Sequence, residues 1–436
     1  MDTITHGIAG ALIAKAAFRG QDMFGAKPVN RQRIITWSLM LGAIFPDSDV
    51  FREFFSHNDL LILTWHRSIT HSLVCLPIFA LALAALTRWL ARSKEWRGPV
   101  AVVISKVLGL GIFGGVVRRW FAGKEEWDAP SFTSLSAIYA VAILSHILLD
   151  LVTSFGTMIW SPVKWSRPAW DLIFIIDFTF TAILLAPQIV AWVYAKEEGL
   201  QRRALGSWMV FAVGTAGVAA IGRAVDAPLS VSGILAAVVI FAAAFLLPAV
   251  RKWGLRVQLA SWNLAGLLIA FGYIAAAVYA HQVALERVDK LSSLLHLDVQ
   301  SRGALPSPPS MWHWDGLIRA PRGVYELRMD LSGESTEVQA ASAGVNTGSS
   351  LSYRYYPDAA SNSYIEAAKR LPEVQTVLWF ARFPVTRFHK EGTDAIVEIS
   401  DLRFPQTRPD RPASFTYRVR FDANGSVISQ GWVRPM

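Results

Sequence analysis

Long apolar blocks separated by short polar segments occupy the first two thirds of the chain. A run of about 17–25 apolar residues is long enough to cross a bilayer as a helix. Blocks of this kind cover residues 4–18, 34–51, 69–90, 98–117, 133–153, 171–195, 205–223, 230–249 and 258–280. The fourth block contains Lys106 and five glycines, which makes it the weakest of the series. The pattern predicts an all-α polytopic membrane bundle.

From about residue 290 the pattern changes to alternation with a period of two. Arg302 to Ser310, RGALPSPPS, is expected to be a linker. Later runs such as VYELRMDL, SLSYRYY, TVLWFARFPVTRF, AIVEISDLRF and FTYRVRF predict half-buried strands. Asn424-Gly425 predicts a tight hairpin turn. We therefore expect a membrane-embedded core at 1–195, additional transmembrane helices at 196–289, and a small β-rich soluble domain at 290–436.

Basic residues set the expected orientation, because cytoplasmic loops collect Lys and Arg. The segments after the first, third, fourth, sixth and eighth blocks are rich in them, and the other connections are poor. Two rich segments, 88–97 and 118–124, flank the fourth block, so both are cytoplasmic only if that block does not cross. We expect residues 98–117 to be a re-entrant or in-plane helix, with about eight spans in all. Both termini, and the β-rich domain, are then extracytoplasmic.

Composition supports a membrane protein and narrows its chemistry. Of 436 residues, 53% are hydrophobic and 17% are charged, against about 25% charged in soluble domains. The net charge of +9 comes without a basic stripe interleaved with aromatics, so membrane lipids are expected as partners and nucleic acid is not. The single cysteine, Cys75, excludes an intramolecular disulfide and a thiolate zinc cluster.

Ionisable side chains in apolar segments are costly and therefore mark candidate functional positions. Seven of them lie near block ends that the charge pattern places on the outer face: His6, Asp47, Asp49, His66, His71, His146 and Asp150. Arg67 accompanies them, and Asp171, which opens the sixth block, is as readily a partner of the helix dipole. The predicted orientation rests on Lys and Arg and uses none of these seven His and Asp residues. Because all seven nevertheless lie near the same face of the membrane, we expect them to form one site.

The spacing and residue types point to a metal. His146 and Asp150 are four residues apart, on one helix face. Imidazole and carboxylate without thiolate suit zinc or another first-row divalent ion in a catalytic site. The seven groups exceed what one tetrahedral ion needs, so two or more ions are expected. Taken singly, each residue has a simpler explanation: a histidine can pack helices, Asp47 and Asp49 can cap a helix, and Arg67 can bind lipid phosphate.

The stretches MDTITHGIAG, FPDSD, HRSITHS and SHILLDLVTSFG, in this order, resemble the YdjM family of membrane-bound, predicted metal-dependent hydrolases. The resemblance covers roughly residues 1–190 and implies that the seven residues above are the metal-site positions, in a protein of the inner membrane. More distantly, the ligand pattern is similar to that of the zinc-dependent phospholipase C and P1 nuclease group. The chain departs from that group in having no N-terminal Trp and in its apolar helices.

The sequence thus predicts a membrane-bound metal-dependent hydrolase acting on a phosphoester or lipid-linked substrate at the outer interface. A metal-activated water would attack the substrate. Asp47 or Asp49 would act as base or bridging ligand, and Arg67 would bind the substrate's charge. The alternative is a transport or metal- or proton-sensing protein that uses the same residues, although an ion path needs polar groups on both sides of the membrane. A third interpretation, an inactive scaffold, predicts missing ligands, and none of the seven is missing.

Overall fold

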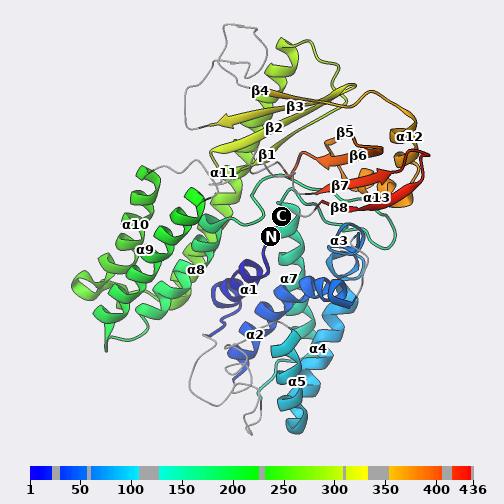
Figure 1. The fold of residues 1–436 in the computed structure, drawn as a ribbon. Helices are drawn as coiled ribbons and strands as arrows, with labels where there is room; N and C mark the ends of the chain where they lie inside the picture. The colour runs from blue at the N-terminus through cyan, green and yellow to red at the C-terminus, as the bar shows by residue number, and fades with distance from the viewer. Residues whose placement is uncertain are drawn as a thin grey trace.

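A helical bundle with two β-sheets at one end makes up the structure (Figure 1). The structure is a computed structural model that describes residues 1–21, 30–55, 60–107, 127–224, 231–307, 311–331, 353–404 and 415–433. The main helices of the bundle are α1 (Thr3–Ala17), α2 (Arg31–Ile44), α4 (Leu76–Arg92), α5 (Lys94–Val107), α7 (Phe132–Leu151), α8 (Phe178–Val193), α9 (Leu200–Ala224), α10 (Val231–Leu246) and α11 (Leu259–Leu294). Shorter helical segments are η1 (Phe45–Phe55), α3 (Leu61–Thr64), η2 (Ile69–His71) and η4 (Leu247–Arg256).

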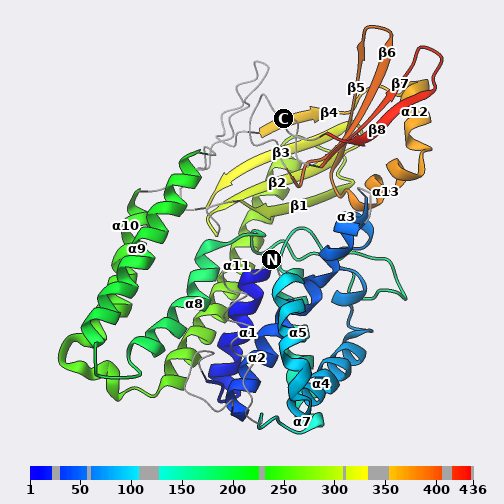
Figure 2. The ribbon, with the colours of Figure 1, turned by 60° about the horizontal axis from the view of Figure 1, so that its bottom comes forward.

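The N-terminal part of the bundle packs α1, α2, α4 and α7 together (Figure 2). The candidate site lies on α1, α7 and the segments η1 and η2, which connect α2 to α4. Small residues allow the close approach: a Cβ added to Gly10 would lie 2.4 Å from the carbonyl oxygen of Leu39. Apolar side chains of α2, α4 and α7, among them Trp37, Ala84 and Ile143, form the core between them. Packing through small residues is typical of helices in a bilayer.

Among the described residues, four helices are long and apolar enough to cross a membrane: α7, α9, α10 with η4, and α11. A fifth span arises if the bent pair Leu61–His71 and Leu76–Arg92 crosses as one unit. The expected blocks at 4–18, 34–51 and 171–195 instead form helices of 15, 14 and 16 residues. The prediction of about eight spans is therefore not confirmed. Exposed apolar side chains such as Val210, Val213 and Leu235 cover α9 and α10, as expected for helices that face lipid.

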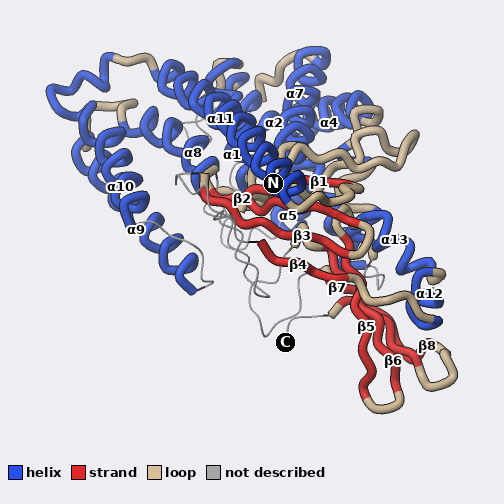
Figure 3. The backbone as a smooth tube through the Cα atoms, turned by 90° about the horizontal axis from the view of Figure 1, so that it is seen from above, coloured by secondary structure: helices blue, strands red, loops and turns tan. Residues whose placement is uncertain are grey.

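The C-terminal part contains two antiparallel four-stranded sheets, as Figure 3 shows. The first has the order β1 (Ser301–Pro306), β2 (His313–Ala320), β3 (Gly323–Asp330) and β4 (Tyr353–Pro357). The second has the order β5 (Pro384–Glu391), β6 (Asp394–Asp401), β7 (Thr416–Phe421) and β8 (Val427–Trp432). The helices α12 (Ser363–Lys369) and α13 (Pro372–Phe380) connect the two sheets. The β-rich character of this region is as predicted, and Gly425 has a positive φ of 85° in the turn between β7 and β8.

The β-rich part packs directly on the loops that surround the candidate site. Arg382, just before β5, pairs with Asp171 through two contacts of 2.9 and 2.8 Å. Arg403 donates a hydrogen bond to the carbonyl oxygen of Ser154 at 3.0 Å. The ring of Phe155 lies 5.2 Å from that of Phe380, between ring centres. The loop between α7 and α8 is therefore held between the bundle and the sheets.

Several local predictions differ from the structure. Residues 301–306 form strand β1 where a linker was expected, and 308–310 lie outside the described residues. The run TVLWFARFPVTRF begins in helix α13, because Pro372 opens a helix whose buried side chains Val374 and Val377 are three apart. Asp171 does not open a helix, since α8 begins at Phe178. Residues 94–107 form α5, and the remainder of the expected re-entrant segment 98–117 lies outside the described residues.

Candidate metal centre

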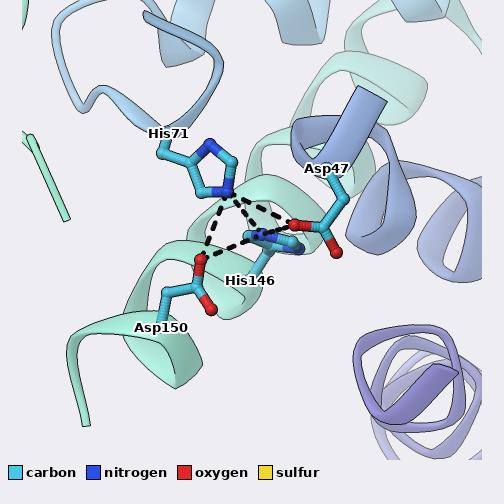
Figure 4. Close-up of side chains that lie close together, drawn as sticks. All are labelled: Asp47, His71, His146 and Asp150. Carbon is cyan, nitrogen blue, oxygen red and sulfur yellow. Dashed lines mark hydrogen bonds and ion pairs between the residues drawn. The ribbon is translucent and has the colours of Figure 1, made fainter. Parts of the chain in front are cut away.

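Four buried side chains converge between the ends of α1, α2 and α7 and the segment before α4. They are Asp47, His71, His146 and Asp150, and one ligand atom of each lies within 4.8 Å of the others (Figure 4). Asp47 belongs to η1, which follows α2 directly, and His71 ends η2. His146 and Asp150 come from the last turns of α7, as predicted, and share one face because they are four residues apart.

The separations between histidine and aspartate atoms in this group are close to those around a single tetrahedral ion, and the separation of the two histidine nitrogens is shorter. His71 Nε2 lies 3.2 Å from Asp150 Oδ2 and 3.6 Å from Asp47 Oδ1. His146 Nε2 lies 3.4 Å from each of the same two oxygens. The two Nε2 atoms are 2.9 Å apart. Four atoms at about 2.0–2.2 Å from one tetrahedral ion would be about 3.3–3.6 Å from one another.

The other ring nitrogens make contacts that orient the two histidines. His146 Nδ1 lies 2.5 Å from the carbonyl oxygen of Ala43, which can only accept, so Nδ1 carries the hydrogen. His71 Nδ1 lies 3.3 Å from Asp49 Oδ2, which favours the same tautomer. In the neutral form of both rings, the Nε2 atoms then present lone pairs toward the centre of the group. Asp150 Oδ2, which faces the same point, is a buried oxygen without a hydrogen-bond donor among the described residues. This donor set fits a cation.

Asp49 holds the residues around the centre rather than joining the four. Its carboxylate accepts hydrogen bonds from the backbone N–H of Arg67 at 2.9 Å and the hydroxyl of Thr70 at 3.2 Å. His66 Nδ1 lies 2.9 Å from its other oxygen. Burial alone would raise the pKa of Asp49, but the contacts with His66 and His71 hold it below its ordinary value. Such an outer carboxylate fixes the orientation of a ligating imidazole.

Arg67 is also buried and forms an ion pair with Asp150. Its Nη2 lies 3.0 Å from Asp150 Oδ1, and its Nη1 donates to the hydroxyl of Thr153 at 2.9 Å. The positive φ of 59° at Arg67 directs its N–H to Asp49 and its side chain to Asp150. This conformation is strained for a residue with a side chain, and such strain is often found at functional sites.

His6 lies beside the four ligands. Its ring stacks on that of His146 with centres 3.6 Å apart, and its Nε2 is 3.2 Å from Asp150 Oδ1. The amino group of Met1 contacts the same oxygen. His66 is 17% exposed and lies at Asp49, on the outer side of the group. Of the seven predicted ligands, the structure thus gathers four in one group and places Asp49, His66 and His6 around it; that these three bind a metal stays a prediction.

Two polar residues that support the site were not predicted from the sequence. The hydroxyl of Thr3 donates to Asp47 Oδ2 at 2.6 Å. Arg167 donates to the carbonyl oxygens of Leu63 and His66 at 2.8 and 2.7 Å. Burial, followed by the nearby charges of Arg67 and Arg403, lowers the pKa of Arg167 to about 9. Thr3 lies within the MDTITHG stretch, which could have indicated it, whereas Arg167 lies in a loop without a recognisable pattern.

Comparison with known proteins agrees with the resemblance noted from the sequence. A family model described as YdjM inner membrane protein matches residues 1–225. The match includes all seven predicted ligands, and it ends before the β-rich part. Searches of curated proteins and of solved structures each returned no match.

Proposed function

Because this chain belongs to the YdjM inner membrane protein family, whose matched region contains the buried His/Asp group, we propose that it is a membrane-bound metal-dependent hydrolase. Its substrate would be a phosphoester or a lipid-linked molecule at the outer membrane interface. The observation that carries the proposal is the pair of Nε2 atoms of His71 and His146, 2.9 Å apart between two carboxylates. Two imidazole lone pairs facing each other in a buried site repel unless a proton or a metal ion lies between them, and the two carboxylates beside them favour the metal ion.

The ligand set restricts the ion. Two imidazoles and two carboxylates suit zinc, manganese, iron or cobalt in the divalent state. An ion that kept four-coordinate geometry with all four ligands would have no position left for substrate. We therefore propose zinc with expanded coordination, or an ion that takes five or six ligands, and the expectation of two or more ions is tested by the same metal analysis. When bound, such an ion polarises a phosphoryl oxygen and lowers the pKa of water.

The side chains around the proposed ion have different roles in the proposed reaction. Asp49 is engaged by Arg67, Thr70, His66 and His71, so we assign it a positioning role and assign the role of base or bridging ligand to Asp47. His66 is held through Nδ1 by Asp49, and its Nε2 has no partner among the described residues. An imidazole oriented in this way is suited to give a proton to a leaving group. Arg67 would act by holding Asp150, and its predicted contact with substrate stays a prediction.

The surroundings of the site support a substrate in the membrane. The loop between α7 and α8 exposes Trp160, Trp165 and Trp170, each by 47–52%. Exposed tryptophans are enriched at membrane–water interfaces, where the indole ring meets the headgroups. The same loop borders the site, because Met158 N donates to the carbonyl oxygen of Arg67 at 2.8 Å. We propose that the loop lies at the outer interface, with the β-rich part extracytoplasmic.

Metal analysis of the detergent-purified protein, followed by hydrolysis assays on soluble phosphoesters and on phospholipids, tests the proposal. The parent should retain at least one equivalent of a divalent ion and cleave a lipid or lipid-linked phosphoester. His146→Ala with Asp150→Ala should lose both properties. The matched control, His296→Ala with Asp298→Ala, changes an exposed His and Asp outside the group and should lose neither.

The rival function predicts a different result. A transport or sensing protein would bind the ion and hydrolyse none of the substrates, and a transporter would move the ion into proteoliposomes. Cleavage of soluble esters alone would contradict the membrane-substrate part of the proposal and leave the hydrolase part standing.

A further inference from the structure

A surface groove of about 890 Å³ lies between α8 and α9, away from the metal centre. Its walls are mainly apolar and include Leu185, Ile189, Val210 and Phe211. At one end it is bordered by Lys196, Arg202 and Arg203, with Glu198 as the acidic residue among them. We propose that this groove binds an anionic phospholipid, with an acyl chain along the apolar walls and the phosphate at the basic end.

The three basic residues differ in what they contact. Arg203 donates to the carbonyl oxygen of Val193 through Nε and Nη2, at 3.2 and 3.0 Å, and also to those of Lys196 and Glu198. It therefore fixes the connection between the two helices and satisfies the end of α8. The side chains of Lys196 and Arg202 are exposed, and neither makes a hydrogen bond or ion pair within the described part of the chain. Their charges are available to a ligand.

The local charge favours an anion. Glu197, next in the chain, is engaged by Lys252. Three cations against the single carboxylate of Glu198 leave an excess of positive charge at the end of the groove. The segment also enters α9 at Leu200, and the N-terminal N–H groups of a helix attract phosphate. Apolar walls beneath a phosphate-binding end match a phospholipid and would not suit a free phosphate.

The position of the groove agrees with this occupant. α8 begins near the metal centre, where Thr181 contacts Thr5 of α1 at 2.7 Å, and it ends at Val193. A helix of 16 residues is about 24 Å long, so the basic end lies most of a bilayer's thickness from the site. The positive-inside rule places this basic segment at the cytoplasmic leaflet. Anionic lipids attract basic residues at that surface.

The groove offers a clean test of the acyl-chain part. Gly206 lines it, and a Cβ added there meets no other atom within 4 Å, so Gly206→Leu places a side chain at the groove from an open position. Gly214→Leu is the matched control, because Gly214 lies on the same helix with equally open space but does not line the groove. Lys196→Gln with Arg202→Gln tests the phosphate part, and Arg223→Gln, in the last turn of α9, controls for loss of charge.

Native mass spectrometry of the full-length protein, taken from nanodiscs of equimolar phosphatidylglycerol and phosphatidylcholine, measures the lipid retained. The parent should retain phosphatidylglycerol in preference, and the double glutamine variant should lose this preference by on the order of tenfold. Gly206→Leu should lose the bound lipid, while Gly214→Leu and Arg223→Gln should resemble the parent. Equal retention of both lipids by the parent, or lipid unaffected by Gly206→Leu, would overturn the proposal. So would a change from dimer to monomer in Gly206→Leu, because the groove would then be occupied by a second copy.

Discussion

His71 Nε2 and His146 Nε2 lie 2.9 Å apart, although the hydrogen-bond partners of both rings place the hydrogens on the Nδ1 atoms. When both rings are neutral, the contact is between two acceptors, held in place by backbone and carboxylate groups on the far sides of the rings. A cation converts this repulsive contact into coordination. The group could hold an ion, and under the proposed function the stability of the protein should depend on that ion.

Chelation should destabilise the protein in a manner that depends on these two residues. An ion that binds only the folded state stabilises it by about 2.7 kcal/mol when present at 100 times its dissociation constant. A chelator should therefore lower the melting temperature of the parent in detergent. It should have no such effect on His71→Ala or His146→Ala. Equal shifts in the parent and in these variants would show that the ion binds elsewhere.

Asp49→Asn should weaken metal binding without abolishing it. The amide keeps the size of the side chain, but its NH₂ group cannot accept from both His66 and His71 as the carboxylate does. Loss of an outer carboxylate of this kind typically costs 10–100-fold in metal affinity. Competition with a fluorescent chelator measures the affinity. Asp128→Asn, an exposed position, serves as control. Complete loss of the metal would instead indicate that Asp49 is itself a ligand.

His66→Gln should separate metal binding from turnover. If His66 donates a proton, its removal should lower kcat by about 10²–10⁴-fold while the metal content stays unchanged. Metal content and kcat are measured on one preparation. A fall in metal content that parallels the fall in kcat would return His66 to the ligand role predicted from the sequence.

Arg403→Ala should destabilise the contact between the β-rich part and the bundle. The Arg403 guanidinium lies 2.7 Å from Asp401, and both side chains are at most 2% exposed. Removing one member of a buried pair leaves the other charge unpaired and costs about 3–5 kcal/mol. Arg387→Ala, an exposed position on β5, should change stability by less than about 0.5 kcal/mol. Thermal unfolding of the full-length protein in detergent compares the two variants.

Stability should also fall as pH rises through the range in which Asp315 ionises. Burial, with the neighbouring charge of Glu326, raises the pKa of Asp315 to about 6, against about 3.9 in an unfolded chain. Between pH 4 and 6 the folded state binds more protons, so deprotonation favours unfolding, by about 1–3 kcal/mol at neutral pH. Asp315→Asn keeps an acceptor for the Ser307 hydroxyl and should be more stable than the parent at pH 7. The two should converge at pH 4 in thermal melts.

The membrane class, the β-rich part and a buried group of His and Asp could be predicted from the sequence, because these depend on local patterns. Hydropathy marks apolar helices, alternation marks strands, and the four-residue spacing of His146 and Asp150 fixes a shared helix face. Local patterns do not show which residues meet in space. Asp49 lies beside the group of four, where it accepts from the backbone N–H of Arg67 and contacts His66, and these contacts require the folded chain.

The same limit explains the differences in fold. Pro372 starts a helix within a segment rich in strand-forming residues, because Val374 and Val377 find a core against Leu63 and sheet β5–β8. The proline-rich stretch after α11 forms β1 because Ala304 packs against that helix and the strand pairs with β2. In each instance contacts distant in sequence override a local preference.

Helix α11 runs without interruption for 36 residues, about 54 Å, whereas the hydrocarbon core of a bilayer is about 30 Å thick. Its final turns pack through Val288 and Leu291 on the first sheet. The length of the helix thus sets the distance of the β-rich part from the bundle, and its rotation sets the orientation of the sheets. One residue inserted near Ala277 would turn the sheets by about 100° and move Arg382 away from Asp171. Seven inserted residues would return the sheets to almost the original orientation, about 10 Å further from the bilayer. The length of α11 therefore determines whether the β-rich part contacts the loop beside the candidate site through Arg382 and Asp171.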